Sequence, residues 1–432
     1  MNLTSALRYL DAHTNREATA GVVHGLSLDS ARRLVGVLGD PHTAYPVIHV
    51  TGTNGKGSTV RMVTELLRAS GLSVGTYTSP HLHTLHERLV WDGEPISDDD
   101  LAEQITAVAE VEGLSGVTPS YFEILTAAAF RWFADLAVDV AVVEVGMLGR
   151  YDATNVADGQ VAVLTNVGRD HTDGAGRWRE RIAEEKVGIV KPGATFVLGE
   201  TDPDLRAVFA STPAAETWLR GREFASEANR VALGGRVVDL RTPGGRIDDL
   251  YLPVHGAHQG ENAAVALAAT EAFFGRPLDD EVVTEAFGGL RLPARFEIVR
   301  RDPTVIVDGA HNVDGARTVA ETLAEEFTLS GSLIVVVGLL AGRDPADVLE
   351  AMGATEAGFL VACTPDSPRA IPGSQVAAAA EGLGIVAEAV GSVEDAVQRA
   401  LSVAGPDDVV VVAGSIYVAG PARAALLAEE HV

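Results

Sequence analysis

The sequence predicts an α/β fold in which a largely parallel sheet carries a small antiparallel patch and is followed by a second, smaller α/β domain. Apolar runs alternate with amphipathic stretches from residue 46 onward, which is typical of successive βα units. The runs 139–145 and 161–165 are apolar almost without interruption, as expected of strands that helices cover on both faces. The alternation restarts after residue 297, which indicates a second domain.

Each expected element follows from its local pattern. Short valine-rich runs predict strands, and longer amphipathic stretches between them predict helices. In the first domain we expect strands at 47–50, 74–78, 138–145 and 161–165 and helices at 60–69 and 122–136. Residues 204–255 contain shorter alternating stretches and Gly-Gly turns, which predict the antiparallel patch, and the alanine-rich run 261–274 predicts a helix.

The second domain is expected to begin near Pro293. Strands are predicted after this point at 305–307, 333–337, 358–362 and 409–412. Strands that alternate with helices in this way are typical of a small Rossmann-like domain. We therefore expect one domain at residues 1–293 and another at residues 294–432.

Composition excludes several classes of protein. The chain has 432 residues, of which 47% are hydrophobic, so it is long enough for two cores. It has no apolar run of the roughly 18 residues that a membrane helix needs and no basic-then-apolar start, so we expect a cytoplasmic protein without a membrane partner. The net charge of −27 argues against nucleic-acid binding. The single cysteine, Cys363, excludes an intramolecular disulfide and a multi-thiolate metal site.

A glycine-rich turn directly after the apolar run 47–50 predicts a phosphate-binding loop. Backbone N–H groups freed by its glycines, together with a helix that we expect to begin near Ser58, can surround a polyphosphate, and the Lys56 ammonium can neutralise it. Lysine is rare in this chain, so its presence here indicates a functional requirement; the alternative is an ordinary strand-to-helix turn. The predicted nucleotide-binding residues of the loop are Gly52, Thr53, Asn54, Gly55, Lys56, Gly57 and Ser58.

Three further residues are candidate magnesium ligands. Ser79 follows the strand 74–78, Glu144 ends the strand 138–145, and His171 comes shortly after the strand 161–165. A bound nucleoside triphosphate needs Mg²⁺, which prefers oxygen ligands. Because the carboxyl ends of parallel strands meet at one edge of a sheet, these residues are expected to converge there. Each one taken singly has a structural alternative.

The motifs resemble those of a known family. The loop 51–58 departs from the strict P-loop spacing, since Val50 stands at the first glycine position, and it resembles the loop of the Mur ligase superfamily, specifically that of folylpolyglutamate synthase and dihydrofolate synthase. The segments 78–82, 144–155, 170–172 and 183–189 look like successive signatures of the same enzymes, in order. The resemblance spans roughly residues 5 to 420 and implies ATP-dependent amide ligation.

The resemblance implies roles for the metal-site residues and for Lys186. Ser79 and Glu144 match residues that hold one Mg²⁺, and Glu144 and His171 match residues that hold a second. Lys186 matches a lysine that is carbamylated in that family; the alternative is an ion pair with a neighbouring glutamate. Because an amine must be uncharged to react with CO₂, a buried position would favour this modification.

The later motifs resemble nucleotide and glutamate contacts. Asn262 matches an adenine contact, Arg295 matches an arginine that reaches the ATP phosphates, and Asp308 matches a nucleotide contact. Ala294 stands where the family usually has glycine. His311 and Ser415 match positions at the incoming glutamate, although Ser415 can equally belong to a turn. The expected catalytic residues are Lys56, Lys186 and His311.

A pterin site is expected from three loosely matching segments of the first domain. Phe122 is an aromatic side chain that can stack on a flat ring, or it can be part of the core. The other members of this group follow the same resemblance. The candidate substrate residues are His13, Thr14, Ser120, Tyr121, Phe122, Glu123, Tyr151, Asp152 and Ala153.

We therefore expect an ATP-dependent ligase that joins L-glutamate to dihydropteroate, to folates or to both, through an acyl phosphate and with two Mg²⁺ ions. Domain closure at Pro293 would exclude water, and a monomer is expected.

Only about fifty residues precede Gly52, which is too few for the nucleotide-sugar domain of a peptidoglycan-precursor ligase. Another amino-acid ligase of the superfamily, acting on a different carboxylate, and a P-loop switch ATPase remain as alternatives.

Overall fold

The computed structural model describes residues 1–15, 17, 27–169 and 176–429, which form two compact units. The first unit contains residues 1–229, 237–252 and 260–290, and the second contains 230–236, 253–259 and 291–432. The chain therefore passes between the units several times before residue 291. The expected division into 1–293 and 294–432 stays a prediction.

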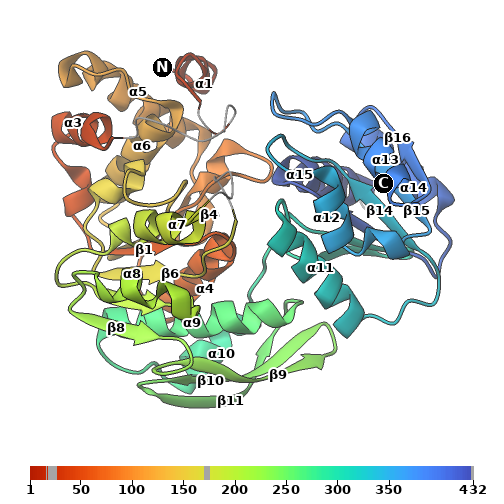
Figure 1. Ribbon diagram of the computed structural model, residues 1–432. Helices are drawn as coiled ribbons and strands as arrows, with labels where there is room; N and C mark the ends of the chain where they lie inside the picture. Colours follow the sequence, from red (N-terminus) through yellow and green to blue (C-terminus); the bar gives the residue numbers. More distant parts are fainter. Residues whose placement is uncertain (16, 18–26, 170–175, 430–432) are drawn as a thin grey trace. The chain divides into compact units, whose positions relative to one another are not determined.

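An eight-stranded sheet forms the centre of the first unit (Figure 1). Its strand order is β4-β3-β2-β5-β1-β6-β7-β8, and the six strands from β2 to β8 in this order are parallel. β3 and β4 add an antiparallel edge. The strands are β1 Val47–Thr51, β2 Val74–Tyr77, β3 Leu89–Trp91, β4 Glu94–Pro95, β5 Val140–Glu144, β6 Val161–Leu164, β7 Thr195–Leu198 and β8 Glu216–Leu219.

Helices cover both faces of this sheet. On one face, the ring of Phe133 from α6 shares a core with Tyr77 and Val143 from the strands. On the other face, α4 packs against β1, β2 and β5. Every residue of β5 is buried, as the uninterrupted apolar run predicts. The helices are α1 Leu3–Asp11, α3 Asp29–Val37, α4 Lys56–Ala69, α5 Asp98–Ser115, α6 Tyr121–Asp135, α7 Trp178–Lys186, α8 Arg206–Ala210, α9 Ala257–Phe274 and α10 Asp280–Gly288.

A separate three-stranded sheet has the order β11-β10-β9. Its strands are β9 Ala225–Ala232, β10 Gly235–Thr242 and β11 Gly245–Leu252. The sequence predicted an antiparallel patch over 204–255, but β8, which lies within that range, pairs parallel to β7 in the large sheet. The shorter alternating stretch at β8 was therefore assigned to the wrong sheet.

A six-stranded sheet forms the centre of the second unit, in the order β12-β13-β17-β14-β15-β16 (Figure 1). Only β12 is antiparallel to its neighbour. The strands are β12 Glu297–Arg301, β13 Thr304–Val307, β14 Leu333–Val337, β15 Phe359–Ala362, β16 Ala387–Ala389 and β17 Val409–Ala413. The helices are α11 Val313–Glu326, α12 Pro345–Ala351, α13 Gly373–Gly382, α14 Val393–Val403 and α15 Ile416–Glu429.

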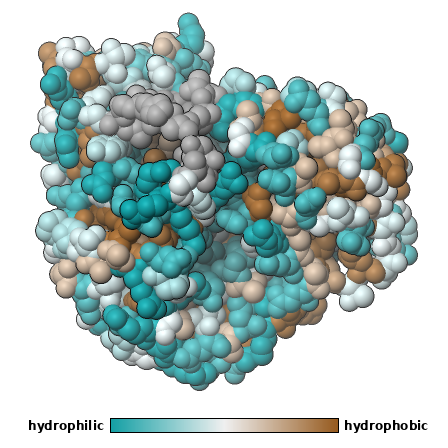
Figure 2. Space-filling view, in the orientation of Figure 1, coloured by the Kyte–Doolittle hydropathy of each residue, from teal (hydrophilic) through white to brown (hydrophobic). Residues whose placement is uncertain are grey.

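The surface is mainly hydrophilic on the face that Figure 2 shows, and hydrophobic residues are scattered among the hydrophilic ones. Among the residues that the structure describes, every helix is too short or too polar to span a bilayer.

A buried ionic cluster joins separate pieces of the second unit. The Arg236 guanidinium, with 1% of its side chain exposed, donates to Glu326 at 2.5 Å and to Glu325 at 2.9 Å. The Glu326 carboxylate also contacts the Nδ1 atom of His255 at 2.6 Å and accepts from the Gly256 N–H at 2.7 Å. Burial by itself would raise the pKa of Glu326, but these hydrogen bonds lower it below its ordinary value.

We predict that Glu326→Ala lowers the free energy of unfolding by about 2–3 kcal/mol, because it leaves buried donors of Arg236 and Gly256 without an acceptor. Glu325→Ala is the matched control: that side chain is 45% exposed, so its loss should cost under about 1 kcal/mol. Chemical denaturation followed by circular dichroism measures both values. Equal losses for the two variants would show that the buried carboxylate has no special role.

The same cluster predicts a pH dependence. Since the pKa of Glu326 is lower in the folded than in the unfolded chain, its stabilisation is complete above the unfolded pKa of about 4.3. The stabilisation is lost as the pH falls through the folded pKa. The stability difference between wild type and Glu326→Ala should therefore shrink in acid.

Candidate active site

The phosphate loop occupies the turn between β1 and α4. The sequence indicated a helix start near Ser58, but α4 begins at Lys56 and is preceded by Gly55, whose φ of 81° favours glycine. Gly52 has a φ of 153°, and a Cβ atom there would lie 1.8 Å from the Oγ1 atom of Thr165. Both glycines are therefore required by the shape of the loop.

Hydrogen bonds hold the loop to the segment after β6. The Thr53 N–H donates to the backbone oxygen of Asn166 at 3.1 Å. The Asn54 N–H donates to the Oδ1 atom of the same residue at 2.9 Å. The Asn54 carbonyl accepts from the Nδ2 atom of Asn166 at 3.1 Å and from the Oγ1 atom of Thr165 at 2.7 Å. Thr53 Oγ1 accepts from the Gly168 N–H at 2.9 Å. We call these contacts between residues 51–54 and 165–168 the loop brace.

The loop brace determines which backbone amides can face a phosphate. The amides of Thr53 and Asn54 already donate to Asn166. The first turn of a helix has no intrahelical acceptors for its N–H groups, and the first bond inside α4 runs from Thr59 N–H to the Gly55 carbonyl at 2.9 Å. The amides of this first turn are thus the natural phosphate donors. Sequence reasoning missed Asn166, whose only signal was its place after an apolar strand.

Lys56 and Asn262 both lie at the loop. The Lys56 ammonium donates to the carbonyls of Gly52 at 3.1 Å and Thr53 at 3.2 Å, so it folds back over its own loop. A Cβ atom on Gly55 would lie 2.6 Å from the Oδ1 atom of Asn262 in α9. The fold therefore brings together two predicted residues that are far apart in the sequence.

Two of the three candidate metal ligands are adjacent. Ser79 follows β2 and Glu144 ends β5, and these strands are neighbours in the sheet. The Ser79 N–H donates to the Oε2 atom of Glu144 at 3.2 Å, and Glu144 is paired with Val50 of β1. Hydroxyl and carboxylate oxygens suit Mg²⁺. The third candidate, His171, lies outside the described residues, and within the described ranges no group of three His, Cys, Asp or Glu residues is placed to hold a metal ion.

Lys186 is the last residue of α7 and is only 4% exposed. Its backbone lies against Gly149, where a Cβ atom would come within 2.8 Å of the Lys186 carbonyl oxygen. The segment that follows Glu144 therefore packs on the helix end that carries Lys186.

The remaining nucleotide candidates lie in the second unit. The Asp308 carboxylate accepts from the N–H groups of Phe296 at 2.7 Å and Ala310 at 2.6 Å. Burial raises the pKa of Asp308, and the nearby Arg295 guanidinium opposes this rise. A Cβ atom on Gly309 would lie 3.3 Å from the Nη1 atom of Arg295, so the guanidinium lies beside the turn after β13.

Ala294, where the resemblance led us to expect glycine, has a backbone conformation that favours glycine. Its φ of 53° lies in the left-handed region, and its carbonyl accepts from the Gly309 N–H at 2.8 Å. Alanine adopts this conformation here at a cost of roughly 1 kcal/mol relative to glycine. The backbone geometry is retained although the residue differs.

His311 and Ser415 follow neighbouring parallel strands of the second unit, β13 and β17. The Gly414 N–H donates to the Ala310 carbonyl at 3.0 Å, which ties the two strand ends together. Ser415 is 1% exposed, directly precedes α15, and its Oγ atom has no hydrogen-bond partner among the described residues. A buried hydroxyl and a helix N-terminus together suit a carboxylate or another anion.

The predicted aromatic run begins α6, where some of its residues have structural roles. Ser120 and Glu123 form a capping box, with Ser120 N–H to Glu123 Oε2 at 2.6 Å and Glu123 N–H to Ser120 Oγ at 3.3 Å. The Tyr121 N–H donates to the Thr14 carbonyl at 3.1 Å. Phe122 is partly buried, with its ring 6.0 Å from that of Tyr77.

The other substrate candidates differ in exposure. His13 contacts the Tyr9 carbonyl at 2.8 Å and Glu112 at 3.3 Å through its two ring nitrogens. Tyr151 is 42% exposed, whereas Asp152 and Ala153 are buried. The Asp152 carboxylate caps the short helix η3 (Ala153–Val156).

Sequence reasoning missed Arg88, which connects three of these segments. Its guanidinium is 2% exposed and forms a bidentate pair with Glu17 at 2.9 and 2.7 Å. Its Nε–H donates to the Nδ1 atom of His81 at 3.0 Å, and it lies 5.9 Å from the centre of the Tyr121 ring. The N-terminal segment, the Ser79 loop and α6 are thus joined by one cation.

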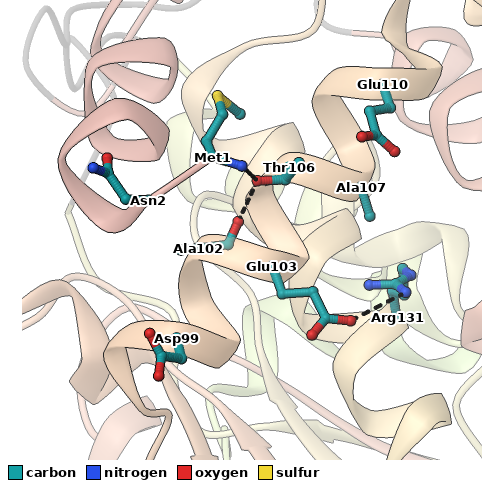
Figure 3. Close-up of a pocket in the computed structure, with 9 residues that line it drawn as sticks. All are labelled: Met1, Asn2, Asp99, Ala102, Glu103, Thr106, Ala107, Glu110 and Arg131. Carbon is teal, nitrogen blue, oxygen red and sulfur yellow. Dashed lines mark hydrogen bonds and ion pairs between the residues drawn. The ribbon is translucent and has the colours of Figure 1, made fainter.

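Figure 3 shows a cavity of about 390 Å³ among α1, α5 and α6. The Met1 amine donates to the Oγ1 atom of Thr106 at 2.8 Å within it. None of the predicted site residues lines this cavity, so it is distinct from the candidate active site. Its lining residues are Met1, Asn2, Asp99, Ala102, Glu103, Thr106, Ala107, Glu110 and Arg131.

Comparison with known proteins agrees with the fold. The Mur ligase middle domain matches residues 50–270, and the Mur ligase glutamate ligase domain matches residues 294–416. A dihydrofolate synthase/folylpolyglutamate synthase of Mycobacterium tuberculosis is 39% identical over 92% of this chain and 89% of its own length. A folylpolyglutamate synthase of Lacticaseibacillus casei is 34% identical over 99% of both chains.

Solved structures give the same result. The structure of Mycobacterium tuberculosis folylpolyglutamate synthase complexed with ADP and AMPPCP has a TM-score of 0.90 and 36% identity, with 98% of both chains covered. A bifunctional folylpolyglutamate synthase/dihydrofolate synthase with Mn, AMPPNP and L-glutamate bound has a TM-score of 0.85 and 30% identity, covering 100% of this chain and 98% of its own.

A phosphate loop on a largely parallel sheet, followed by a separate α/β glutamate ligase domain, defines an ATP-dependent ligase. The chain belongs to the Mur ligase family and, within it, to the family of folylpolyglutamate synthases and dihydrofolate synthases. The predicted family, fold class and enzyme class are confirmed.

We predict that Gly52→Ala lowers ATP-dependent turnover by about 10²-fold, because the added Cβ atom must displace Thr165 and with it the loop brace. Gly113→Ala in α5 is the control, since a Cβ atom there meets nothing within 4 Å. Turnover and melting temperature are measured for both variants. Unchanged turnover in a folded Gly52→Ala variant would show that the loop does not need this glycine.

Proposed function

We propose that this chain uses ATP to join L-glutamate to the carboxylate of dihydropteroate, of folates, or of both. The observation that carries the proposal is the braced phosphate loop beside the Ser79–Glu144 pair at the carboxyl edge of the large sheet. The related structures contain ADP, the ATP analogues AMPPCP and AMPPNP, Mn and L-glutamate, which correspond to the nucleotide, the divalent cation and the amino acid of such a reaction.

The proposed reaction has two steps. An oxygen of the substrate carboxylate attacks the γ-phosphorus of ATP, so that ADP leaves and an acyl phosphate forms. The α-amine of glutamate then attacks the acyl carbon, phosphate leaves, the amine gives up a proton, and an amide bond forms. No protein nucleophile is required, so positioning and charge neutralisation account for catalysis.

Residues of the first unit are assigned to ATP. The first-turn amides of α4 and the Lys56 ammonium neutralise the phosphate oxygens, and Asn262, which lies at Gly55, contacts the nucleotide. In the second unit, Arg295 and Asp308 are assigned to the nucleotide and His311 and Ser415 to glutamate. The Ser415 hydroxyl, which directly precedes α15 and has no hydrogen-bond partner within the described residues, supports this last assignment.

Ser79 and Glu144 would hold a first Mg²⁺, and Glu144 with His171 would hold a second. Their oxygen and imidazole donors fit this ion, and Glu144 is buried at the end of β5. The ions supply charge neutralisation on the triphosphate. Lys186 is assigned to the same neighbourhood as a carbamylated residue, and intact-mass measurement tests this by an added mass of about 44 Da, that of CO₂.

Residues 120–123 and 151–153 are assigned to the pterin ring, with Phe122 as its stacking surface and His13 and Thr14 at the N-terminal side.

The monomeric state, the cytoplasmic location and the absence of a nucleic-acid partner stay predictions. Another carboxylate substrate is the nearest alternative within the family. A switch ATPase would hydrolyse ATP without any dependence on glutamate.

The deciding experiment incubates the purified protein with ATP, Mg²⁺, glutamate and either dihydropteroate or a folate, and reads the product masses. Each added glutamate should increase the mass by about 129 Da, the residue mass, and release one phosphate. Phosphate release that is independent of glutamate and leaves both pterins unchanged would instead identify an ATPase.

We predict that Lys56→Ala abolishes glutamate-dependent ADP formation, with a loss of at least about 10³-fold, while the melting temperature changes little. Lys56→Arg, which keeps the charge, should recover only part of the activity because the guanidinium is larger and planar. Glutamate-dependent turnover that survives in Lys56→Ala would refute the role of this lysine.

A further inference from the structure

A carboxylate and a guanidinium hold both backbone polar groups of Val167. The Val167 N–H donates to the Oε2 atom of Glu200 at 2.8 Å, and the Val167 carbonyl accepts from the Nε–H of Arg179 at 3.0 Å. The Nη2 atom of Arg179 lies 3.3 Å from the same Oε2 atom. Val167 follows β6, Glu200 follows β7 and Arg179 lies on α7, so three elements meet at one residue. We call the side chains of Glu200 and Arg179 the Val167 clamp.

Val167 lies between the two residues that hold the phosphate loop. On one side, Asn166 accepts from the N–H groups of Thr53 and Asn54. On the other side, the Gly168 N–H donates to the Oγ1 atom of Thr53 at 2.9 Å. Because a residue has only two soft backbone torsions, fixing Val167 restricts the positions of both neighbours. A side chain that fixes Val167 therefore constrains the loop through the loop brace.

Glu200 uses the whole acceptor capacity of its carboxylate in this cluster. Its Oε1 atom accepts from the N–H groups of Thr201 and Asp202, both at 2.9 Å, and its Oε2 atom accepts from Val167 and Arg179. An ionised carboxylate has about four acceptor positions. Glu200 is buried, so a donor that loses this partner pays for its desolvation. A glutamine here would replace one acceptor oxygen by an NH₂ group, which cannot accept from these donors.

Arg179 is held in one orientation by two carboxylates. Its Nη1 atom pairs with Asp202 and its Nη2 atom with Glu200. The guanidinium is planar, so these two pairs also fix the direction of the Nε–H, which donates to the Val167 carbonyl. The Arg179 side chain is 39% exposed, which makes it the less buried half of the clamp.

We propose that Glu200 and Arg179 are positioning residues that keep the phosphate loop in its nucleotide-binding shape by fixing Val167. This inference rests on the proposed assignment of the loop to ATP. A loop that must reorganise when the nucleotide arrives loses part of the binding free energy to that ordering. The clamp reduces this loss, because the loop brace keeps the first-turn amides of α4 directed before a phosphate binds.

The opposite charges of the two side chains separate positioning from electrostatics. Glu200→Gln removes a negative charge, so electrostatics alone would strengthen the binding of a polyphosphate. Arg179→Gln removes a positive charge, so electrostatics alone would weaken it. Positioning predicts weaker binding in both variants. The direction of the change in Glu200→Gln therefore decides between the two explanations.

The test measures the dissociation constant for AMPPNP with Mg²⁺ by titration calorimetry, together with the melting temperature. In Glu200→Gln we expect this constant to rise about tenfold, equivalent to about 1.4 kcal/mol, and in Arg179→Gln to rise about threefold. Glu271→Gln is the matched control, because Glu271 is a buried carboxylate of the same unit that accepts from the Leu278 N–H at 3.1 Å. The control should stay within about twofold of wild type.

A double-mutant cycle with Asn166→Ala tests the route through the loop brace. If Glu200 acts through Asn166, the dissociation constant of the double variant rises by less than the product of the two single effects. A merely structural role for Glu200 would lower the melting temperature without this coupling. If Glu200→Gln does not fold, Arg179→Gln takes its place in the cycle, since the more exposed Arg179 is easier to replace.

Three results would overturn the clamp. These are an unchanged or lower dissociation constant in Glu200→Gln, an equal rise in Glu271→Gln, and independent effects in the double-mutant cycle. Wild type separates the two proposals. If wild type binds AMPPNP but adds glutamate to no pterin, the proposed substrates are wrong and the clamp is still judged by the same binding constants. An active wild type with an unaffected Glu200→Gln rejects the clamp alone.

Discussion

The loop brace is the constraint on which the rest of the site depends. Because β1 and β6 are parallel neighbours, residues 51–54 and 165–168 leave the sheet at the same edge, and Asn166 bonds to Asn54 in both directions. The close approach of Gly52 to Thr165 leaves no room for a side chain. A loop fixed in this way presents the first-turn amides of α4 without reorganisation when a phosphate arrives.

The acidic character of the chain gives the site a second constraint. A protein with a net charge of −27 repels polyphosphate over most of its surface, so the binding free energy must come from local donors. The loop provides backbone amides and Lys56, but Glu144 is buried at the neighbouring strand end. A carboxylate and a triphosphate at one sheet edge are compatible when a divalent cation lies between them, which is the chemical reason to assign Mg²⁺ to this pair.

The sequence predicted the large parallel sheet well because its central strands are apolar without interruption, and the strand-to-helix turn after β1 because glycines follow that strand. It did not predict β8 as part of that sheet, since a partly exposed edge strand has the same alternating pattern as an antiparallel ribbon. Arg88 and Asn166 were missed because an isolated polar residue has no periodic or motif signal, and only its partners in space reveal its role.

By itself, the sequence determined the fold class and the family, because these depend on local patterns of apolar residues and glycines. Only the tertiary structure decided that Asn262 lies at Gly55 and that Ser79 contacts Glu144. These contacts depend on strand order and helix packing, which bring distant residues within a few ångströms of each other. Hydrogen bonds are short-ranged and directional, so the chemistry of the site is defined only after the sheet has formed.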